Sequence, residues 1–175
     1  MTDETRWFRP TNPHRTFLSL GSNLGNRERS LELAVQLLPQ AGIEIAKVSS
    51  IYSTEPVDFK NQGWFLNQVV LAETQLKPAD LLAECLSVEQ ALGRERMVRK
   101  GPRSLDVDIL LYEDWVVQEA ELTIPHPRLH LRRFVLVPLV EIEPQLIHPA
   151  FHESVTSLLA RCEDPARVVL FNKVC

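Results

Sequence analysis

The segment Ser104-Leu-Asp-Val-Asp-Ile-Leu-Leu111 contains apolar and acidic residues in alternation. Side chains two residues apart on a β-strand point to the same face, so the apolar set would face a core. The same period places Asp106 and Asp108 together on the opposite face, with Cα atoms about 6.5 to 7 Å apart at a rise of ~3.3 Å per residue. We therefore expect a strand with one buried face and two carboxylates on the other.

The segments before this strand alternate between strand and helix patterns. They predict a strand at 16–21, a helix at 24–38 with Asn26 as its N-cap, strands at 43–52 and 66–74, and a helix at 78–92. With the strand at 104–111, this order predicts an α+β fold with a ferredoxin-like βαββαβ core, in which helices pack on one face of an antiparallel sheet.

The last third of the chain has a weaker pattern. It predicts short strands at 115–117 and 122–124, a helix at 132–137 ended by Pro138, a helix after a Ser154 cap, and a strand at 168–171. Residues 1–15 are polar and aperiodic, so we expect a flexible N-terminal leader followed by a single domain at 16–175.

Composition limits the function classes. The chain has 175 residues, 45% of them hydrophobic, and a net charge of −4, which fits one domain and argues against a general nucleic-acid binder. Three widely spaced cysteines lack a Cys-x-x-Cys motif, and no stretch approaches the roughly 20 apolar residues of a membrane helix. We expect a reduced, cytoplasmic protein without a membrane or nucleic-acid partner.

The charge is unevenly distributed along the chain. Residues 94–103 carry five bases and one acid, a local charge of +4, so the rest of the chain carries −8. Paired carboxylates that hold a divalent metal, beside arginines and a lysine, match the needs of a triphosphate. Gly93 and Gly101 at the ends of this basic loop would let it move as a lid. The alternative is a solvated charge run beside a solvated polar strand face.

Three further features outside the loop carry candidate chemistry. His126 lies between two prolines, which suits a fixed hydrogen-bond donor, and those prolines argue against a helical His126–His130 metal site. Glu89 falls on the apolar stripe of the helix at 78–92 and needs a partner, which the basic loop could supply. Phe65 and Phe134 are each ordinary core candidates and gain interest only as a pair.

Five blocks in order resemble the 6-hydroxymethyl-7,8-dihydropterin pyrophosphokinase family over about residues 16 to 171. They are Gly21-Ser-Asn-Leu24, Ser50-Ile-Tyr-Ser-Thr-Glu-Pro56, Phe65-Leu-Asn67, Gly101-Pro-Arg-Ser-Leu-Asp-Val-Asp108, and Pro125-His126 with Arg132 and Phe134. The resemblance implies transfer of the pyrophosphoryl group of ATP to the pterin hydroxymethyl group, with release of AMP, in folate biosynthesis. It also implies an α/β/α arrangement around the ferredoxin-like core.

The resemblance assigns roles to particular residues. The catalytic residues would be Arg94, Arg96 and Arg103, and the ligands of two Mg²⁺ would be Asp106 and Asp108. ATP would bind to Arg99, Arg103, His126, Arg132 and Glu89, and the pterin to Thr54, Pro56, Phe65, Asn67 and Phe134. The expected partners are ATP and 6-hydroxymethyl-7,8-dihydropterin, bound by a monomer.

Two positions depart from the family pattern, since Lys100 replaces a common tryptophan and Glu121 stands where some members have an arginine. Three alternatives stay open from the sequence: a ferredoxin-like nucleic-acid-binding domain, a nucleotidyltransferase, and a catalytically silent paralogue. The first lacks an aromatic strand signature, and the second requires Ser22 and Asp106 to lie closer in sequence.

Overall fold

The computed structural model describes residues 12–57, 61–93 and 102–172. Its elements are β1 (His14–Ser22), α1 (Arg27–Leu37), η1 (Pro39–Ala41), β2 (Ile43–Val48), β3 (Tyr52–Thr54), β4 (Phe65–Thr74), α2 (Pro78–Ala91), β5 (Asp106–Tyr112), β6 (Val117–Gln118), β7 (Thr123–Ile124), η2 (Leu129–Leu131), α3 (Arg133–Ile142), α4 (Val155–Ala160) and β8 (Val168–Leu170). Every expected strand and helix thus has a counterpart.

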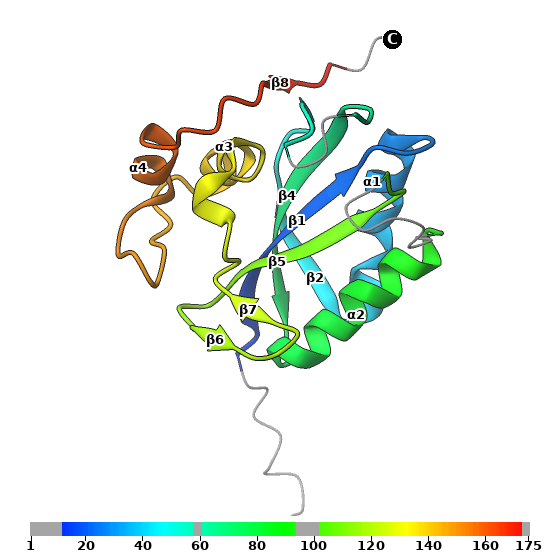
Figure 1. Cartoon of the computed structure of the whole chain (residues 1–175). Coiled ribbons are helices and arrows are strands. Elements are labelled where there is room, and N and C mark those ends of the chain that lie inside the picture. Colours follow the sequence, from blue (N-terminus) through cyan, green and yellow to red (C-terminus); the bar gives the residue numbers. More distant parts are fainter. Residues whose placement is uncertain (1–11, 58–60, 94–101, 173–175) are drawn as a thin grey trace, which may run out of the picture.

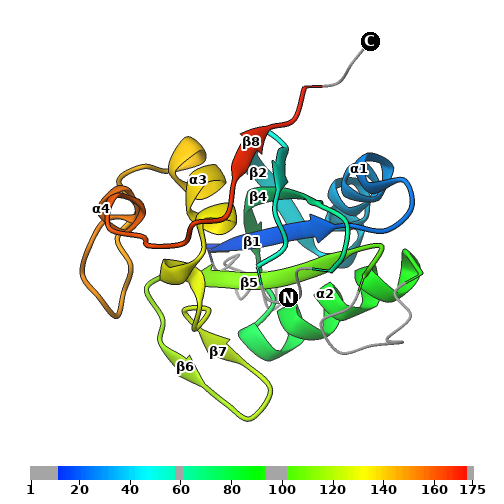
Figure 2. The same ribbon diagram turned by 45° about the horizontal axis from the view of Figure 1, so that its top comes forward.

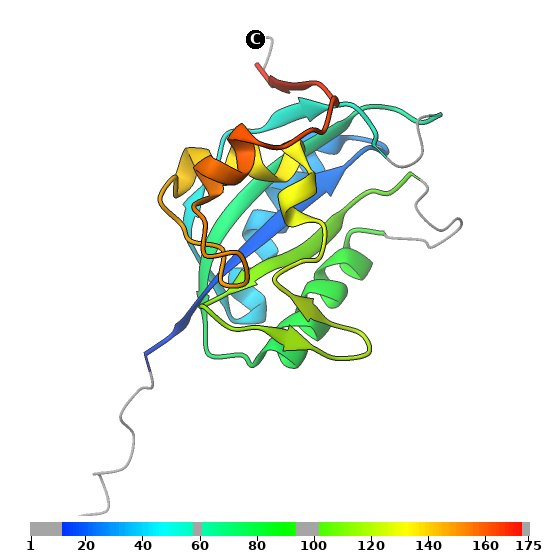
Figure 3. The same ribbon diagram turned by 60° about the vertical axis from the view of Figure 1, so that its left-hand side comes forward.

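One antiparallel sheet forms the centre of the molecule. Its strand order is β5-β1-β4-β3-β8, and β2 pairs with β4 beside β3. Helices α1 and α2 cover one face, whereas α3 and α4 cover the other (Figures 1 and 2). The short β6–β7 hairpin pairs only with itself and lies beside α2 (Figure 3). The predicted α+β class is confirmed.

Two apolar cores lie on the two faces of the sheet, because the strand residues alternate between them. Leu18 and Leu20 of β1 pack with α1 and α2, whereas Phe17 packs with α3 and α4. In β5, Val107 and Ile109 belong to the first core and Leu110 to the second. The buried apolar face expected for the strand around Asp106 is the α2 face.

The strand expected at 43–52 is divided into β2 and β3. Ser49 separates them because its hydroxyl accepts the N–H of Val69 at 3.0 Å, in place of a backbone carbonyl. The Ser49 carbonyl accepts from the Gln68 side chain at 2.9 Å. A polar side chain therefore interrupts the ladder, which hydrophobic periodicity does not reveal.

Several element boundaries also differ from expectation, and the packing explains two of them. β1 begins at His14, two residues before the expected start, where the His14 ring packs against Tyr112 and Trp115 with centroids 5.2 and 5.5 Å away. Helix α3 continues to Ile142 through Pro138, which was expected to end it. Pro138 is buried beside Leu139, so apolar burial offsets the lost backbone hydrogen bond.

Within the described ranges, no helix is both long and apolar enough to cross a membrane.

The helix caps follow the sequence closely. Asn26 accepts from the N–H of Arg29 at 3.0 Å and begins α1, and Ser154 accepts from the N–H of Ser157 at 3.1 Å and begins α4.

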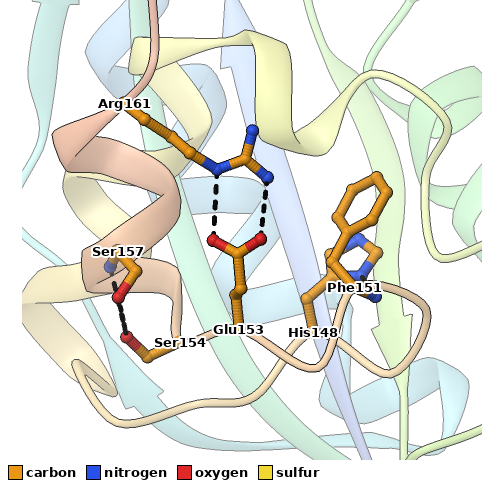
Figure 4. Close-up of polar contacts among 6 residues, drawn as sticks. All are labelled: His148, Phe151, Glu153, Ser154, Ser157 and Arg161. Carbon is orange, nitrogen blue, oxygen red and sulfur yellow. Dashed lines mark hydrogen bonds and ion pairs between the residues drawn. The ribbon is translucent and has the colours of Figure 1, made fainter.

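His148 organises the connection between α3 and α4. It is buried and stacks on Phe151 with ring centroids 4.4 Å apart (Figure 4). Its Nδ1 accepts the N–H groups of Ala150 and Phe151, both at 3.3 Å, so the ring is held with that nitrogen unprotonated. Burial and then the neighbouring His130 lower the pKa of His148 to about 4.

We predict that His148 makes folding less favourable as the pH falls from about 6.5 to 4. In the unfolded chain this imidazole is protonated near its ordinary pKa of 6.5, whereas in the folded chain its pKa is about 4. His148→Asn keeps an acceptor near Nδ1 but cannot titrate. The free energy of unfolding of the variant should therefore fall less steeply, by up to about 1.4 kcal/mol per pH unit for one proton. Urea unfolding at several pH values in this range measures the free energy of unfolding of both proteins. An equal change with pH in the two proteins would contradict the prediction.

Candidate active site

A pocket lies on the sheet face that α3 partly covers. It encloses about 570 Å³, part of which is open solvent, and its wall is built from several strands and the start of α3. The lining residues are Ser19, Gly21, Thr54, Glu55, Pro56, Val57, Gln62, Phe65, Asn67, Arg103, Asp106, Asp108, Arg132 and Phe134. All five expected pterin contacts and both expected metal ligands are therefore brought together.

The floor of the pocket is one row of residues across three strands. Gly21 of β1 pairs with Asp106 of β5 on one side and with Asn67 of β4 on the other. A Cβ atom at position 21 would lie 2.7 Å from Asn67 Oδ1, so the close approach of this amide requires glycine. The row places a carboxylate at one end of the floor and an amide at the other.

The amide end is held rigidly. Asn67 is buried, and its Nδ2 donates to Thr54 Oγ1 on β3 at 2.6 Å. Because the residue pairs of β3 and β4 place Thr54 opposite Phe65, the polar pair lies beside an aromatic ring. A flat polar heterocycle could stack on the ring and reach this fixed donor–acceptor pair.

The acidic end combines two carboxylates with a guanidinium group. Asp106 and Asp108 of β5 pair with Gly21 and Ser19 of the neighbouring strand β1. Because these two partners are small residues, they leave room above the sheet. The Nη1 atom of Arg103 lies 3.0 Å from Asp106 Oδ2. Its Nε is buried without a hydrogen-bond partner among the described residues. This arginine retains a donor for an incoming anion.

Asn23 holds Arg103 in place, a role that the sequence analysis did not assign. Its Oδ1 accepts the N–H of Arg103 at 2.8 Å, and its own N–H donates to the Arg103 carbonyl at 3.1 Å. Asn23, directly after β1, thus fixes the segment that leads into β5. Only its position in the ordered blocks could have indicated this role.

The carboxylate pair suits a metal that arrives with a polyphosphate. Mg²⁺ prefers oxygen ligands and is usually bound by one or two carboxylates together with substrate phosphates and water. The described residues contain no group of three or more His, Cys, Asp or Glu that could form a complete protein site. Asp106 and Asp108 therefore fit Mg²⁺ as partial ligands.

Two aromatic rings line the pocket from different elements, Phe65 from β4 and Phe134 from α3. Each ring has a guanidinium group over it: Arg103 lies 5.6 Å from the Phe65 centroid and Arg132 lies 5.3 Å from the Phe134 centroid. The expected aromatic pair therefore faces one cavity, with a cation beside each ring.

A second hollow lies on the other side of Asp108, between β5, α2 and the β6–β7 hairpin. It encloses about 670 Å³, open solvent included, and Asp108 lines both hollows. His126 and Glu121 line only the second. Asp108, one of the two residues expected to hold metal, thus lies between the pocket and the second hollow.

His126 is oriented by two hydrogen bonds. The backbone N–H of His126 donates to the Leu110 carbonyl at 2.9 Å. The Nδ1 atom of its imidazole ring accepts the backbone N–H of Arg128 at 3.2 Å. Burial, followed by the charges of Arg132 and Arg128, lowers the pKa of His126 to about 4. The imidazole is neutral near pH 7, with Nε2 left as the donor.

Glu89 lies on the buried side of α2, as its place on the apolar stripe predicted, and one partner is the backbone of β5. It is only 1% exposed, lines neither hollow, and accepts the N–H of Val107 at Oε1 over 2.7 Å. Because β5 is an edge strand, its outward N–H needs a partner from outside the sheet. Glu89 therefore supports the strand between the two aspartates. The expected partner loop, with Arg94, Arg96, Arg99 and Lys100, lies outside the described residues.

The chain is similar in sequence to a known protein family and to several of its members. The family model described as 7,8-dihydro-6-hydroxymethylpterin-pyrophosphokinase (HPPK) matches residues 17–144. The 2-amino-4-hydroxy-6-hydroxymethyldihydropteridine pyrophosphokinase of Bacillus subtilis is 47% identical over 131 residues, covering 74% of this chain and 78% of that protein. Its counterpart in Aquifex aeolicus is 43% identical over 137 residues, covering 78% and 85%.

Other relatives are much longer than this chain. The "Folic acid synthesis protein fol1" of Schizosaccharomyces pombe is 44% identical over 144 residues, which are 82% of this chain but 20% of that protein. The crystal structure of Plasmodium falciparum wild-type HPPK-DHPS with pteroate matches with a TM-score of 0.72 at 16% identity, covering 86% of this chain and 45% of that one. At this identity the likeness concerns the fold alone. None of these matches supports the nucleic-acid-binding alternative or a silent paralogue.

We predict that Glu89→Ala lowers the free energy of unfolding by about 1 to 3 kcal/mol, because the buried Val107 N–H loses its acceptor. Glu89→Gln keeps an acceptor oxygen and should lose less. Gln90→Ala, an exposed change at the next position of α2, is the matched control and should be nearly neutral. Denaturant unfolding measures all three, and equal effects of the Ala and Gln variants of Glu89 would contradict the assigned contact.

Proposed function

The chain belongs to the 7,8-dihydro-6-hydroxymethylpterin-pyrophosphokinase (HPPK) family, and on that premise we propose that it transfers pyrophosphate from ATP to 6-hydroxymethyl-7,8-dihydropterin in folate biosynthesis. The bond that forms joins the hydroxymethyl oxygen to the β-phosphorus. The bond that breaks joins this phosphorus to the oxygen bridging it to the α-phosphate, so that AMP leaves. The observation that carries the proposal is that two carboxylates of β5, one aromatic ring of β4 and one of α3 line a single pocket.

The pterin would occupy the amide end of the pocket. Phe65 and Phe134 would stack on its two faces, and the Asn67–Thr54 pair would bind its polar edge together with the backbone around Pro56. The support is that all five residues line one cavity and that Asn67 is already fixed by its bond to Thr54. A fixed polar pair discriminates strongly against a ligand that leaves it unpaired.

ATP would reach the acidic end through the second hollow. Asp106 and Asp108 would hold two Mg²⁺ against the triphosphate, and the metals would supply charge neutralisation and orient the β-phosphorus. Arg103 and Arg132 would bind phosphate oxygens, and neutral His126 would donate a hydrogen bond. The meeting of both hollows at Asp108 supports this arrangement. Arg94, Arg96 and Arg99 remain the predicted lid residues.

Several finer features complete the proposal. The order β5-β1-β4-β2 in the sheet, with α1 and α2 on one face, supports a ferredoxin-like core, and α3 with α4 supplies the third layer. We also propose that the protein acts as a monomer, since the proposed arrangement assigns no role to a second copy. Cys85 and Cys162 are both free, which is consistent with a cytoplasmic enzyme.

We predict that Asp106→Asn and Asp108→Asn each lower pterin-dependent AMP release at least about 100-fold, because both reduce the negative charge that holds Mg²⁺. Pterin binding without ATP should change less than about twofold, since the aromatic walls and Asn67 are untouched. Asp114→Asn, an exposed change just beyond β5, is the control. Incubation with ATP, Mg²⁺ and the pterin, with AMP as readout, measures the effect. Absence of AMP release by the unmodified protein, or full release by both variants, would refute the proposal.

A further inference from the structure

Residues 164–170, which we call the strap, run from beyond α4 past α3 to the outer edge of β3 (Figure 2). The match to the family model ends at residue 144, so the whole strap lies outside it. The strap nevertheless contacts residues on both sides of the pocket, although Asp164 lies 31 residues from its partner and Arg167 lies 112.

Asp164 connects the strap to the start of α3. Its Oδ2 accepts the N–H of Arg133, the first residue of that helix, at 3.0 Å. Arg132, at the N-cap position, makes no side-chain capping bond, so Asp164 supplies an acceptor that the helix's own sequence lacks. Its other oxygen accepts the N–H of Ala166 at 3.0 Å, which fixes the turn of the strap. The next residue of the helix is Phe134.

Arg167 connects the strap to the opposite wall. Its Nε donates to Glu55 Oε1 at 2.9 Å, its Nη2 lies 2.8 Å from the same oxygen, and its backbone N–H donates to Oε2 at 2.9 Å. The Glu55 N–H in turn donates to the Arg167 carbonyl at 3.1 Å. The guanidinium group also lies 4.9 Å from the centroid of the Trp64 ring. Trp64 immediately precedes Phe65.

Strand pairing extends this contact along β3. Val168 pairs with Thr54, the residue that accepts a hydrogen bond from Asn67. A third hollow, of about 980 Å³ with open solvent included, adjoins the pocket at Glu55 and is lined on its other side by Asp164, Pro165 and Ala166 of the strap. The strap therefore lies behind one pocket wall and reaches the other through Asp164.

The opposite end of α3 is attached to the sheet independently. Glu141 accepts hydrogen bonds from the Ser50 N–H at 2.9 Å, the Ser50 hydroxyl at 2.8 Å and the Tyr52 hydroxyl at 2.8 Å. These bonds fix the C-terminal half of the helix against the strands. The end that carries Phe134 is instead held by Asp164.

We propose that the strap sets the spacing between the Phe65 and Phe134 walls, so that Arg167 and Asp164 are positioning residues for the pterin. This inference rests on the proposed pterin pocket. Arg167 lines none of the three hollows described, so its effect on a ligand would pass through Glu55 and Trp64. A preformed gap between two stacking rings raises affinity because less ordering accompanies binding.

The ion pair itself contributes little to global stability. The Arg167 side chain is 69% exposed, and exposed pairs are generally weak. Loss of the pair should therefore leave the melting temperature nearly unchanged while loosening one wall. The strap thus predicts a selective defect in pterin binding, whereas a purely structural role predicts parallel changes in both substrates or in stability.

The chain offers a matched control at the C-terminal end of α4, where Arg161 is the C-cap residue. Arg161 forms a similar two-point pair with Glu153, with Nε–Oε2 at 3.1 Å and Nη2–Oε1 at 3.2 Å, and its guanidinium lies 5.9 Å from the Phe151 centroid (Figure 4). Each arginine thus forms an ion pair with one glutamate and places its guanidinium group near one aromatic ring. Arg161 lines none of the described hollows.

The test compares Arg167→Gln, Arg161→Gln and Asp164→Ala in the full chain, with direct binding of 6-hydroxymethyl-7,8-dihydropterin followed by its fluorescence. We expect Arg167→Gln and Asp164→Ala to raise the pterin Kd about five- to tenfold, and the ATP Kd by less than about twofold. Arg161→Gln should change neither. Thermal unfolding of the two arginine variants should be alike.

Each other outcome has a definite meaning. If the unmodified protein does not bind the pterin, both the proposed function and the strap are overturned. If it binds the pterin and Arg167→Gln binds equally well, the strap alone is overturned. Equal losses of pterin and ATP affinity, or an equal effect of Arg161→Gln, would assign the strap a general structural role and would also overturn the inference.

Discussion

The site depends on the alternation of side chains along β5. Leu105, Val107 and Ile109 are buried in the core under α2, and this burial turns Asp106 and Asp108 onto the opposite face. A slip of one residue would move the carboxylates into the apolar core, so packing fixes where they point. The hydrogen bond from the Val107 N–H to Glu89 adds a polar constraint at the sheet edge. A buried carboxylate on one face thus supports the strand that presents two carboxylates on the other.

The remaining features of the pocket follow from a two-sided sheet. A face packed entirely by large side chains would leave no cavity, and here Ser19 and Gly21 leave space between the acidic strand and Asn67. Helix α3 then brings Phe134 over this space, opposite the end of β4. One sheet face therefore combines a place for metal and phosphate with a place for a flat ring, which matches the two substrates of the proposed reaction.

Local periodicity was sufficient to predict the elements that build the site. The strand with Asp106, the helix that contains Glu89 and the caps at Asn26 and Ser154 all follow from residues close in sequence. The period of two predicted that Asp106 and Asp108 share a face, but their pairing with Gly21 and Ser19 depends on which strands are neighbours. The acceptor role of Glu89, the interruption at Ser49 and the bonds of Arg167 involve partners 18, 20 and 112 residues away. Such contacts depend on tertiary packing and leave no repeating pattern in one sequence.

The proposed reaction requires Asp106 and Asp108 to hold divalent metal jointly between the triphosphate and the pterin. Electron paramagnetic resonance of Mn²⁺, in a complex with the pterin and an unreactive ATP analogue, measures this directly. We expect two Mn²⁺ per chain with dipolar coupling that corresponds to ions about 3.5 to 4 Å apart. The coupling should disappear when either aspartate is replaced. A single uncoupled ion, or coupling that survives the loss of Asp108, would contradict the account.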